Sequence, residues 1–188
     1  MTILEIKNLE RQKYKYLRKH SNFMQKKKVM QNVEAFLESF FSNERQHNYV
    51  AIYYPLKDEV DLRDLKKKYS LALPKCLPNK KLEFYIWDEN PLKKDLQGIP
   101  APDNNNLLDS DQISLILISC LSIDKRLIRL GYGGGYFDKL RSNKSWRNIP
   151  CIGILTSNCV SKDFLSNASW DIPLTGFITD KEIFYNIL

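Results

Sequence analysis

The chain has 188 residues, of which 43% are hydrophobic and 27% charged, a composition typical of one soluble globular domain rather than of a disordered or fibrous chain. The apolar runs, such as Leu115–Ile118, are far shorter than a bilayer span or a signal peptide requires. The sequence therefore predicts a cytoplasmic protein. The four cysteines form no CxxC pair, and the two histidines, His20 and His47, are expected on the surface, so neither zinc, disulfides nor a histidine-dependent triad is expected.

The net charge of +7 is compatible with three kinds of partner: a nucleic acid, an acidic membrane surface or a polyanionic small molecule. Much of this charge comes from runs such as Lys26–Lys28 and Lys66–Lys68, which are typical of the solvated faces of helices. No nucleic-acid-binding module or aromatic-basic ribonucleoprotein pattern occurs. We therefore expect neither a nucleic acid nor a membrane as partner. A non-catalytic basic module that binds RNA or another polyanion stays open as the alternative function.

Two helices and a strand are predicted at the start of the chain. The polar and basic stretch Glu5–Lys19 predicts the first helix, and after Ser21 the helical spacing of apolar residues from Val33 to Phe41 predicts the second. The β-branched and aromatic run Tyr49–Tyr54 then predicts a strand, which Pro55 ends.

Strands and helices alternate along the rest of the chain. Several strands are too continuously apolar to have one face in water, so they belong inside a sheet that helices cover on both faces. The order of elements predicts an α/β fold, a three-layer domain with a largely parallel sheet. The further predicted strands are Leu71–Pro74, Leu82–Trp87, Ile113–Ile118, Ile149–Leu155 and Gly176–Thr179, and the predicted helical segments are Val60–Tyr69, Gly135–Arg141 and Lys162–Leu165.

One long irregular segment, Asp88–Asn106, is rich in Pro, Asn and Asp. Because compact domains seldom contain an idle connection of that length, we expect it to border the functional site. No internal repeat is visible and no Gly/Ser-rich linker divides the chain, so residues 1–188 are expected to form a single domain.

The stretch RLGYGGGYFDKL, Arg129–Leu140, places four of the chain's seven glycines within five positions. It follows the apolar strand Ile113–Ile118 and leads into a helical pattern, near the sheet edge where α/β proteins bind ligands. Because glycine lacks a Cβ, successive backbone N–H groups can converge there on an anion, and the helix after Gly135 adds its N-terminal partial charge. The stretch is therefore predicted to bind phosphate.

The residues around the glycines indicate a metal-bound nucleotide. The pattern matches neither GxxxxGK[ST] nor GxGxxG, so it is neither a Walker loop nor a dinucleotide fingerprint. Arg129 offers a bidentate fork for phosphate oxygens, and Asp138 is a hard oxygen ligand of the kind that Mg²⁺ takes. The alternative is a glycine-rich turn in which Asp138 only complements a helix dipole.

The same stretch resembles the signature of the 5-formyltetrahydrofolate cyclo-ligase family, which is approximately RLGxGxGYYDR preceded by an apolar strand and an aspartate. The likeness extends in the same order over nearly the whole chain. It includes YLRK at Tyr16–Lys19, YYPLKDEVD at Tyr53–Asp61, ALPK at Ala72–Lys75, GIPAP at Gly98–Pro102, Asp124, and WDIPLTGFIT at Trp170–Thr179.

The resemblance implies a mixed-sheet, Rossmann-like α/β fold in a monomer. It also implies an ATP- and Mg²⁺-dependent conversion of 5-formyltetrahydrofolate to 5,10-methenyltetrahydrofolate, with release of ADP and phosphate. In that mechanism the formyl oxygen attacks the γ-phosphate and N10 closes the ring. Nucleophile and leaving group both belong to the substrates, so the enzyme mainly positions them and neutralises charge.

The resemblance assigns roles to individual residues of the glycine-rich stretch. Tyr132 to Tyr136 also approach the folate, and Arg129 and Tyr136 are the candidate catalytic residues. Asp138 and Asp171 take the Mg²⁺-ligand positions, although Asp171 without the resemblance is typical of a turn. The implied ATP-binding residues of this stretch are Arg129, Leu130, Gly131, Tyr132, Gly133, Gly134, Gly135, Tyr136 and Phe137.

Four further residues take implied roles from elsewhere in the chain. Glu59 matches the carboxylate that holds the pterin, and Tyr54 lines the substrate pocket or packs into the core. Arg18 matches an arginine that reaches the ATP phosphates. The family's lysine four residues before Arg18 is Tyr14 here, and Lys15 is the candidate substitute.

The chain also departs from the family pattern inside the glycine-rich stretch. Gly134 stands where a lysine is common, which predicts weaker ATP affinity or compensation by another residue. Phe137 replaces a tyrosine and Lys139 an arginine. Because the glycines indicate ATP more strongly than folate, a nucleotide site with another acceptor is a further alternative.

Overall fold

The computed structural model describes residues 1–42 and 48–186. His20 is exposed, as expected, and His47 lies outside the described residues. Within the described ranges, no helix combines the length and the apolar character needed to cross a membrane.

The two predicted N-terminal helices are confirmed: α1 spans Ile3–Lys19 and α2 spans Phe23–Phe40. Each begins with a capping box. The side chain of Thr2 or Asn22 accepts a hydrogen bond from the third helical N–H, and the side chain of that third residue accepts one from the cap. These reciprocal bonds satisfy donors that the first helical turn would otherwise leave unpaired.

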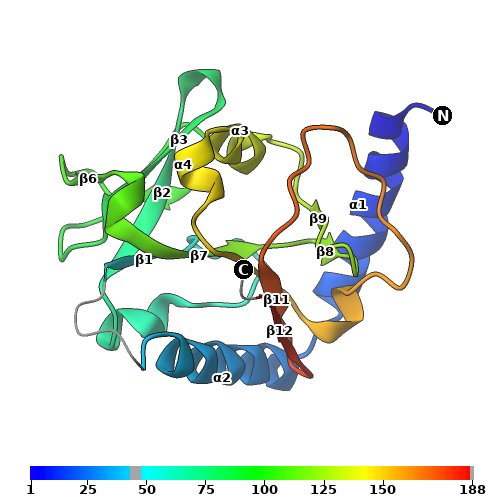
Figure 1. Ribbon diagram of the computed structural model, residues 1–188, viewed down its shortest axis with the longest axis horizontal. Coiled ribbons are helices and arrows are strands. Elements are labelled where there is room, and N and C mark those ends of the chain that lie inside the picture. The colour runs from blue at the N-terminus through cyan, green and yellow to red at the C-terminus, as the bar shows by residue number, and fades with distance from the viewer. Residues whose placement is uncertain (43–47, 187–188) are drawn as a thin grey trace.

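One eight-stranded sheet crosses the molecule in the order β12-β11-β10-β7-β1-β2-β3-β6 (Figure 1). The central strands β11, β10, β7, β1 and β2 pair in parallel, and the remaining strands pair antiparallel toward the two edges. The mostly parallel mixed sheet is thus confirmed. The strands are β1 Tyr49–Ala51, β2 Leu71–Leu77, β3 Lys81–Ile86, β6 Leu107–Leu108, β7 Ile113–Ser119, β10 Cys151–Ile154, β11 Gly176–Ile178 and β12 Ile183–Tyr185.

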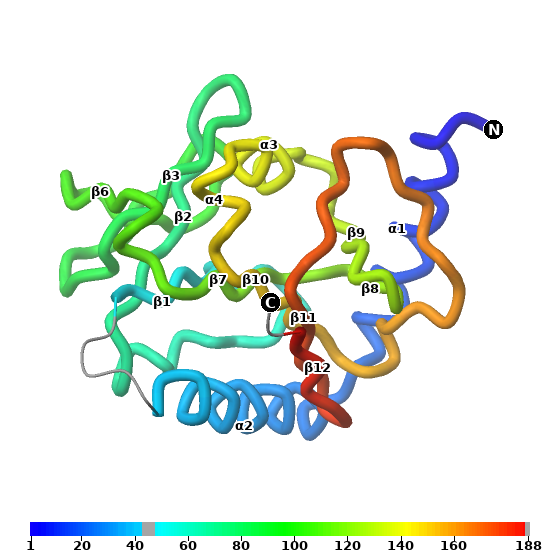
Figure 2. The backbone as a smooth tube through the Cα atoms, in the orientation of Figure 1, coloured from blue at the N-terminus to red at the C-terminus, as the bar shows by residue number. Residues whose placement is uncertain are grey.

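Helices cover both faces of the sheet, which completes the predicted three layers (Figures 1 and 2). Helix α2 packs Val33 and Leu37 into the core on one face. The short helices α3, Tyr136–Ser142, and α4, Lys144–Arg147, cover the other face, where Leu140 is buried. Strands such as β7 are therefore apolar on both sides, as their sequence predicts.

Short elements connect these layers. Two small antiparallel hairpins lie outside the main sheet. Four 3-10 segments occur among the described residues at turns between longer elements. The hairpin strands are β4 Lys93–Lys94, β5 Pro100–Ala101, β8 Ser122–Ile123 and β9 Arg129–Leu130, and the 3-10 segments are η1 Arg63–Lys67, η2 Pro78–Lys80, η3 Ser110–Gln112 and η4 Ser157–Cys159.

Some predicted elements were wrong in type or length. The helix expected over Lys162–Leu165 does not form, because the Leu165 N–H donates to the buried carboxylate of Asp124 at 2.9 Å rather than to a helical carbonyl. The helix expected over Val60–Tyr69 is only the 3-10 segment η1. Strand β12 was missed because three residues carry too little periodicity to be recognised.

Candidate active site

A cavity of about 660 Å³ lies at the carboxyl ends of the parallel strands, where open α/β sheets bind ligands. Tyr53 follows β1 and Ser119 ends β7, and both line the cavity together with parts of α1 and the β2–β3 turn. Gln97 and Ile99 also line it, which confirms that the irregular segment Asp88–Asn106 borders the site. The cavity therefore gathers segments from both halves of the chain.

The glycine loop, defined here as Gly131–Gly135, lines this cavity between β9 and α3. Gly133 and Gly135 have φ angles of +99° and +73°, which residues with a Cβ rarely adopt. The Arg11 side chain of α1 lies against the loop, since its Nε donates to the Gly131 carbonyl at 3.0 Å. A Cβ at Gly133 would lie 3.2 Å from the Arg11 guanidinium carbon. The positive φ thus favours glycine at both positions, and at Gly133 an added Cβ would also push the Arg11 side chain aside by a few tenths of an ångström.

Four charged residues beside the loop form the aspartate cluster: Lys7, Arg129, Asp138 and Asp171. Arg129 Nη2 donates to Asp138 Oδ1 at 3.2 Å. Lys7 Nζ forms an ion pair with Asp171 Oδ2, which also accepts from the Ala168 N–H at 2.6 Å. Arg129, Asp138 and Asp171 share a small side cavity. The structure thus brings the two predicted metal ligands to one place and pairs each with a cation.

The donor set of the aspartate cluster fits Mg²⁺. Among the described residues there is no group of three or more His, Cys, Asp or Glu side chains that could hold a metal. Mg²⁺ commonly uses only one or two carboxylates and takes its remaining ligands from water and substrate phosphates. Asp138 Oδ2 and Asp171 Oδ1 make no hydrogen bond or ion pair within the described part of the chain. Two hard oxygen donors are therefore available.

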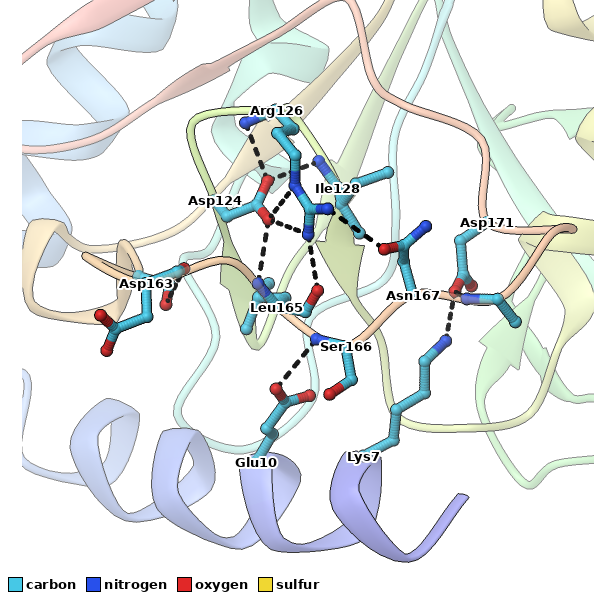
Figure 3. Close-up of polar contacts among 12 residues, drawn as sticks. Lys7, Glu10, Asp124, Arg126, Ile128, Asp163, Leu165, Ser166, Asn167 and Asp171 are labelled. Atoms are coloured by element: carbon cyan, nitrogen blue, oxygen red, sulfur yellow. Dashed lines mark hydrogen bonds and ion pairs between the residues drawn. The ribbon is translucent and has the colours of Figure 1, made fainter. Parts of the chain in front are cut away.

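The segment that carries Asp171 is held by polar contacts that Figure 3 shows. The fully buried Asp124 accepts from the Leu165 N–H at 2.9 Å and from Arg126 Nη2 at 2.8 Å, and Arg126 donates to the Leu165 carbonyl at 2.6 Å. Glu10 of α1 accepts from the Ser166 N–H at 3.0 Å. These bonds hold the segment, which contains no helix or strand of its own, against α1 and against the turn between β8 and β9.

A second group, the Glu59 cluster, consists of Arg18, Glu59, Ser119 and Tyr132. Arg18 Nη1 donates to Glu59 Oε1 at 3.0 Å, and the two side chains are only 7% and 3% exposed. The Ser119 hydroxyl donates to the same oxygen at 2.5 Å, and the Leu56 N–H donates to Oε2 at 2.7 Å. Glu59 is therefore a buried carboxylate in a fixed orientation.

Tyr132 joins the Glu59 cluster to the glycine loop. Its hydroxyl accepts from Arg18 Nη1 at 2.6 Å, and the Arg18 guanidinium carbon lies 5.0 Å from its ring centroid. Burial, and next the nearby Glu59 charge, raise the pKa of Tyr132 well above its usual value of 10.0. The phenol is therefore neutral at physiological pH.

The structure places the other predicted residues at different depths. Arg18 and Lys15 do not line the large cavity, because Arg18 is buried against Glu59 and the exposed Lys15 lies 5.7 Å from the Tyr132 ring centroid. Tyr54 and Tyr136 line it and are partly buried, with Gln97 Nε2 donating to the Tyr136 hydroxyl at 2.9 Å.

Three cations that line the cavity were missed in the sequence: Lys7, Arg11 and Lys80. Lys7 and Arg11 lie four residues apart on α1, so they share a helix face, and this spacing is the one signal that could have found them. Lys80 lies in the turn between β2 and β3, and nothing in the sequence relates that turn to the glycine loop.

The fold and the site together define an α/β enzyme in which a glycine-lined, basic cavity lies at the end of a mostly parallel sheet. The chain belongs to the 5-formyltetrahydrofolate cyclo-ligase family, whose model matches residues 4–180. A 5-formyltetrahydrofolate cyclo-ligase of Haemophilus influenzae is 28% identical over 142 residues, which cover 70% of this chain and 75% of the relative.

Two solved structures share the fold. The Aquifex aeolicus 5,10-methenyltetrahydrofolate synthetase has a TM-score of 0.78 at 24% identity, and the match covers 96% of this chain and 92% of that protein's chain. The Mycoplasma pneumoniae 5,10-methenyltetrahydrofolate synthetase has a TM-score of 0.69 at 26% identity, and the match covers 93% of this chain and 98% of that protein's chain. The family resemblance seen in the sequence motifs is confirmed.

Proposed function

We propose that the chain converts 5-formyltetrahydrofolate to 5,10-methenyltetrahydrofolate with ATP and Mg²⁺, releasing ADP and phosphate. The observation that carries the proposal is that one cavity is lined by the glycine loop, by Glu59 and by both aspartates. Two substrates that react with each other must lie side by side in one site. A single-domain monomer in the cytoplasm, with neither a nucleic acid nor a membrane as partner, is part of the same proposal.

The glycine loop and the cations around it would bind the ATP phosphates. Backbone N–H groups from Gly131 to Gly135 can converge on phosphate oxygens because no Cβ intervenes. Arg129 lines the same cavity and presents a planar fork suited to phosphate. As the formyl oxygen attacks the γ-phosphate, Arg129 would neutralise the charge on the transferred group, and Tyr136 would position the reacting groups.

Glu59 would recognise the pterin. A carboxylate accepts two parallel N–H bonds from an aminopyrimidinone edge, and Glu59 Oε2 accepts only one bond, from Leu56, among the described residues. In this proposal Arg18 fixes the orientation of the Glu59 carboxylate. It does not contact ATP, although the resemblance implies that it would. Tyr54 and Tyr132 offer aromatic surfaces that line the cavity beside it.

Asp138 and Asp171 would hold the Mg²⁺ through the oxygens that have no partner among the described residues. When bound, the ion would supply positive charge to the phosphate oxygens and so would favour transfer. The charge of the ion would weaken the pairing of Lys7 and Arg129 with these carboxylates, so both cations could turn toward the phosphates. The aspartates and cations would in this way exchange partners on binding of metal and nucleotide.

A continuous absorbance assay for the methenyl product tests the proposal, with 5-formyltetrahydrofolate, ATP and Mg²⁺ and with Asp138→Asn as the comparison. Product that requires all three additions, and that the variant fails to form, is the expected result. ATP binding without product would favour another acceptor. Failure of both ligands to bind, together with RNA binding that falls steeply with salt, would favour the polyanion-binding alternative.

A further inference from the structure

Four cations line the large cavity: Lys7, Arg11, Lys80 and Arg129. Three of them already have partners, because Lys7 pairs with Asp171, Arg129 pairs with Asp138, and Arg11 donates to the Gly131 carbonyl. Lys80 makes no hydrogen bond or ion pair with any residue in the described ranges. It is therefore the cation in this cavity whose charge no described protein group satisfies.

Lys80 lies against the glycine loop although it comes from a different part of the chain. A Cβ at Gly135 would lie 3.6 Å from Lys80 Cδ and 3.7 Å from its Nζ. The ammonium group thus approaches the part of the loop that leads into α3. An anion bound on the backbone N–H groups of this loop would lie beside that charge.

The turn that carries Lys80 has an unusual backbone. Asn79 and Lys80 have φ angles of +56° and +55°, in the left-handed region that favours glycine. Asparagine tolerates this conformation, but a long side chain such as lysine gains nothing from it. Positive φ angles are common in the tight turns of β-hairpins, so they fix the path of this turn while its place beside the glycine loop carries the argument.

The turn is also fixed to the helix that follows the glycine loop. Lys139 of α3 donates from Nζ to the Asn79 carbonyl at 2.6 Å. Strands β2 and β3 pair through Leu77 and Lys81 up to the base of the turn. Lys80 is therefore held at a set position relative to the loop, rather than at the end of a free hairpin.

We propose that Lys80 is a phosphate-binding residue, which reaches across from the β2–β3 turn and supplies a point charge to the ATP phosphates bound on the glycine loop. This inference rests on the proposed function for its ligand. Lysine is a suitable residue here because its compact ammonium group binds phosphate as a point charge without needing a planar partner.

Three variants separate the charge of Lys80 from the shape of its turn. Lys80→Gly removes the charge and the side chain from a position with positive φ. Asn79→Gly changes the neighbouring positive-φ position and keeps the charge of Lys80. Lys81→Gln removes the adjacent lysine charge, which does not line the cavity. Lys80→Gly should raise the KM for MgATP about tenfold, the size expected for one charged hydrogen bond. Asn79→Gly and Lys81→Gln should leave that KM within about twofold of wild type.

The KM for folate and the thermal midpoint distinguish binding from a structural role. Lys80→Gly should leave the KM for folate within about twofold and should not lower the midpoint, because glycine suits a positive φ. Lys80→Arg should recover most of the lost affinity. The inference is overturned if Lys80→Gly matches Lys81→Gln. It is also overturned if Lys80→Gly raises both KM values and lowers the thermal midpoint together.

Calorimetric binding of MgATP without folate keeps this inference apart from the proposed function. If the wild type binds MgATP but forms no product, the folate reaction fails while the Lys80 comparison is still measured directly. Weaker MgATP binding by Lys80→Gly alone supports the inference. Equal binding by all three variants and wild type rejects it whether or not product forms.

Discussion

The Glu59 cluster and the aspartate cluster adjoin the same cavity but are built in opposite ways. In the Glu59 cluster a carboxylate is 3% exposed and held by an arginine, a hydroxyl and a backbone N–H. In the aspartate cluster each carboxylate uses only one oxygen; the Asp138 side chain is 34% exposed, and Asp171 is 8% exposed. One cluster is fixed before any ligand binds, whereas the other keeps donors that can change partners. This division suits the proposed ligands, a planar pterin ring beside Glu59 and a metal-bound nucleotide beside the aspartates.

The largest effect should come from breaking the buried ion pair of the Glu59 cluster. Arg18→Met would leave Glu59 buried without its cation, so the free energy of unfolding should fall by about 3–5 kcal/mol. Urea denaturation of the variant and wild type measures the loss. Lys67→Met, which breaks the exposed pair with Asp64, is the control and should not differ measurably from wild type. If the two variants lost the same stability, the buried Arg18–Glu59 pair would contribute no more than an exposed pair, and the Glu59 cluster would not be fixed by it.

A smaller effect on stability and a large one on activity should follow from Asp138→Asn. We expect kcat to fall about 100-fold, because the Mg²⁺ that Asp138 is proposed to hold would stabilise the charge on the transferred phosphoryl group. The free energy of unfolding should change by less than about 1 kcal/mol, since the pair with Arg129 is partly exposed. Mg²⁺ titration of the assay and urea denaturation of the same samples measure both quantities.

Asp163→Asn is the matched control for that variant. Asp163 is exposed on the segment that carries Asp171, and its carboxylate makes no ion pair with any of the described residues. Its kcat and Mg²⁺ dependence should equal those of wild type. A loss of stability in Asp138→Asn as large as that in Arg18→Met would show that the aspartate cluster is also structural.

Single hydroxyl groups sharpen the comparison further. Ser119→Ala removes the 2.5 Å bond to Glu59, so it should lower the free energy of unfolding by about 1 kcal/mol and raise the KM for folate about fivefold. The KM for MgATP should not change. Denaturation and steady-state kinetics measure these values.

Ser122 offers a control for the serine replacement. It is fully buried, and its hydroxyl has no hydrogen-bond partner among the described residues. Ser122→Ala should therefore be neutral or slightly stabilising, because no bond is lost and an unsatisfied polar atom is removed. If Ser119→Ala were equally neutral, the hydroxyl would not contribute to the rigidity of Glu59.

The sequence allowed the elements and the glycine loop to be predicted because both depend on local patterns. Apolar runs such as Ile113–Ile118 predict buried strands, and the spacing of glycines predicts a backbone that approaches a ligand. Asp138 lies three residues after the last glycine of the loop, and its place beside the cavity could be inferred from that short separation.

The partners of the charged residues could not be predicted in the same way. Lys7 and Asp171 are 164 positions apart, and Arg18 and Glu59 are 41 apart, so their pairing depends on how layers pack rather than on local pattern. The helix predicted at Lys162–Leu165 fails for the same reason, since Asp124 takes the N–H of Leu165 from 41 positions away. Long-range polar contacts outweigh weak local propensity at such segments.

The smallest effect should come from an exposed ion pair next to the cavity. Asp61 and Arg63 lie 2.6 Å apart with side chains 50% and 45% exposed, and the hydrogen bonds from Arg63 lower the pKa of Asp61 from its usual 3.8. A lowered pKa means that the pair stabilises the fold above the unfolded-state value and loses this contribution as pH falls through the folded-state value. Asp61→Asn should therefore cost less than about 1 kcal/mol near neutral pH, and this cost should shrink progressively as the pH falls below 3.8, as measured by urea denaturation over that range. A loss of stability that does not shrink as the pH falls would mean that shape rather than charge makes the contact. A loss at neutral pH as large as that of Arg18→Met would show that burial does not set the strength of these ion pairs.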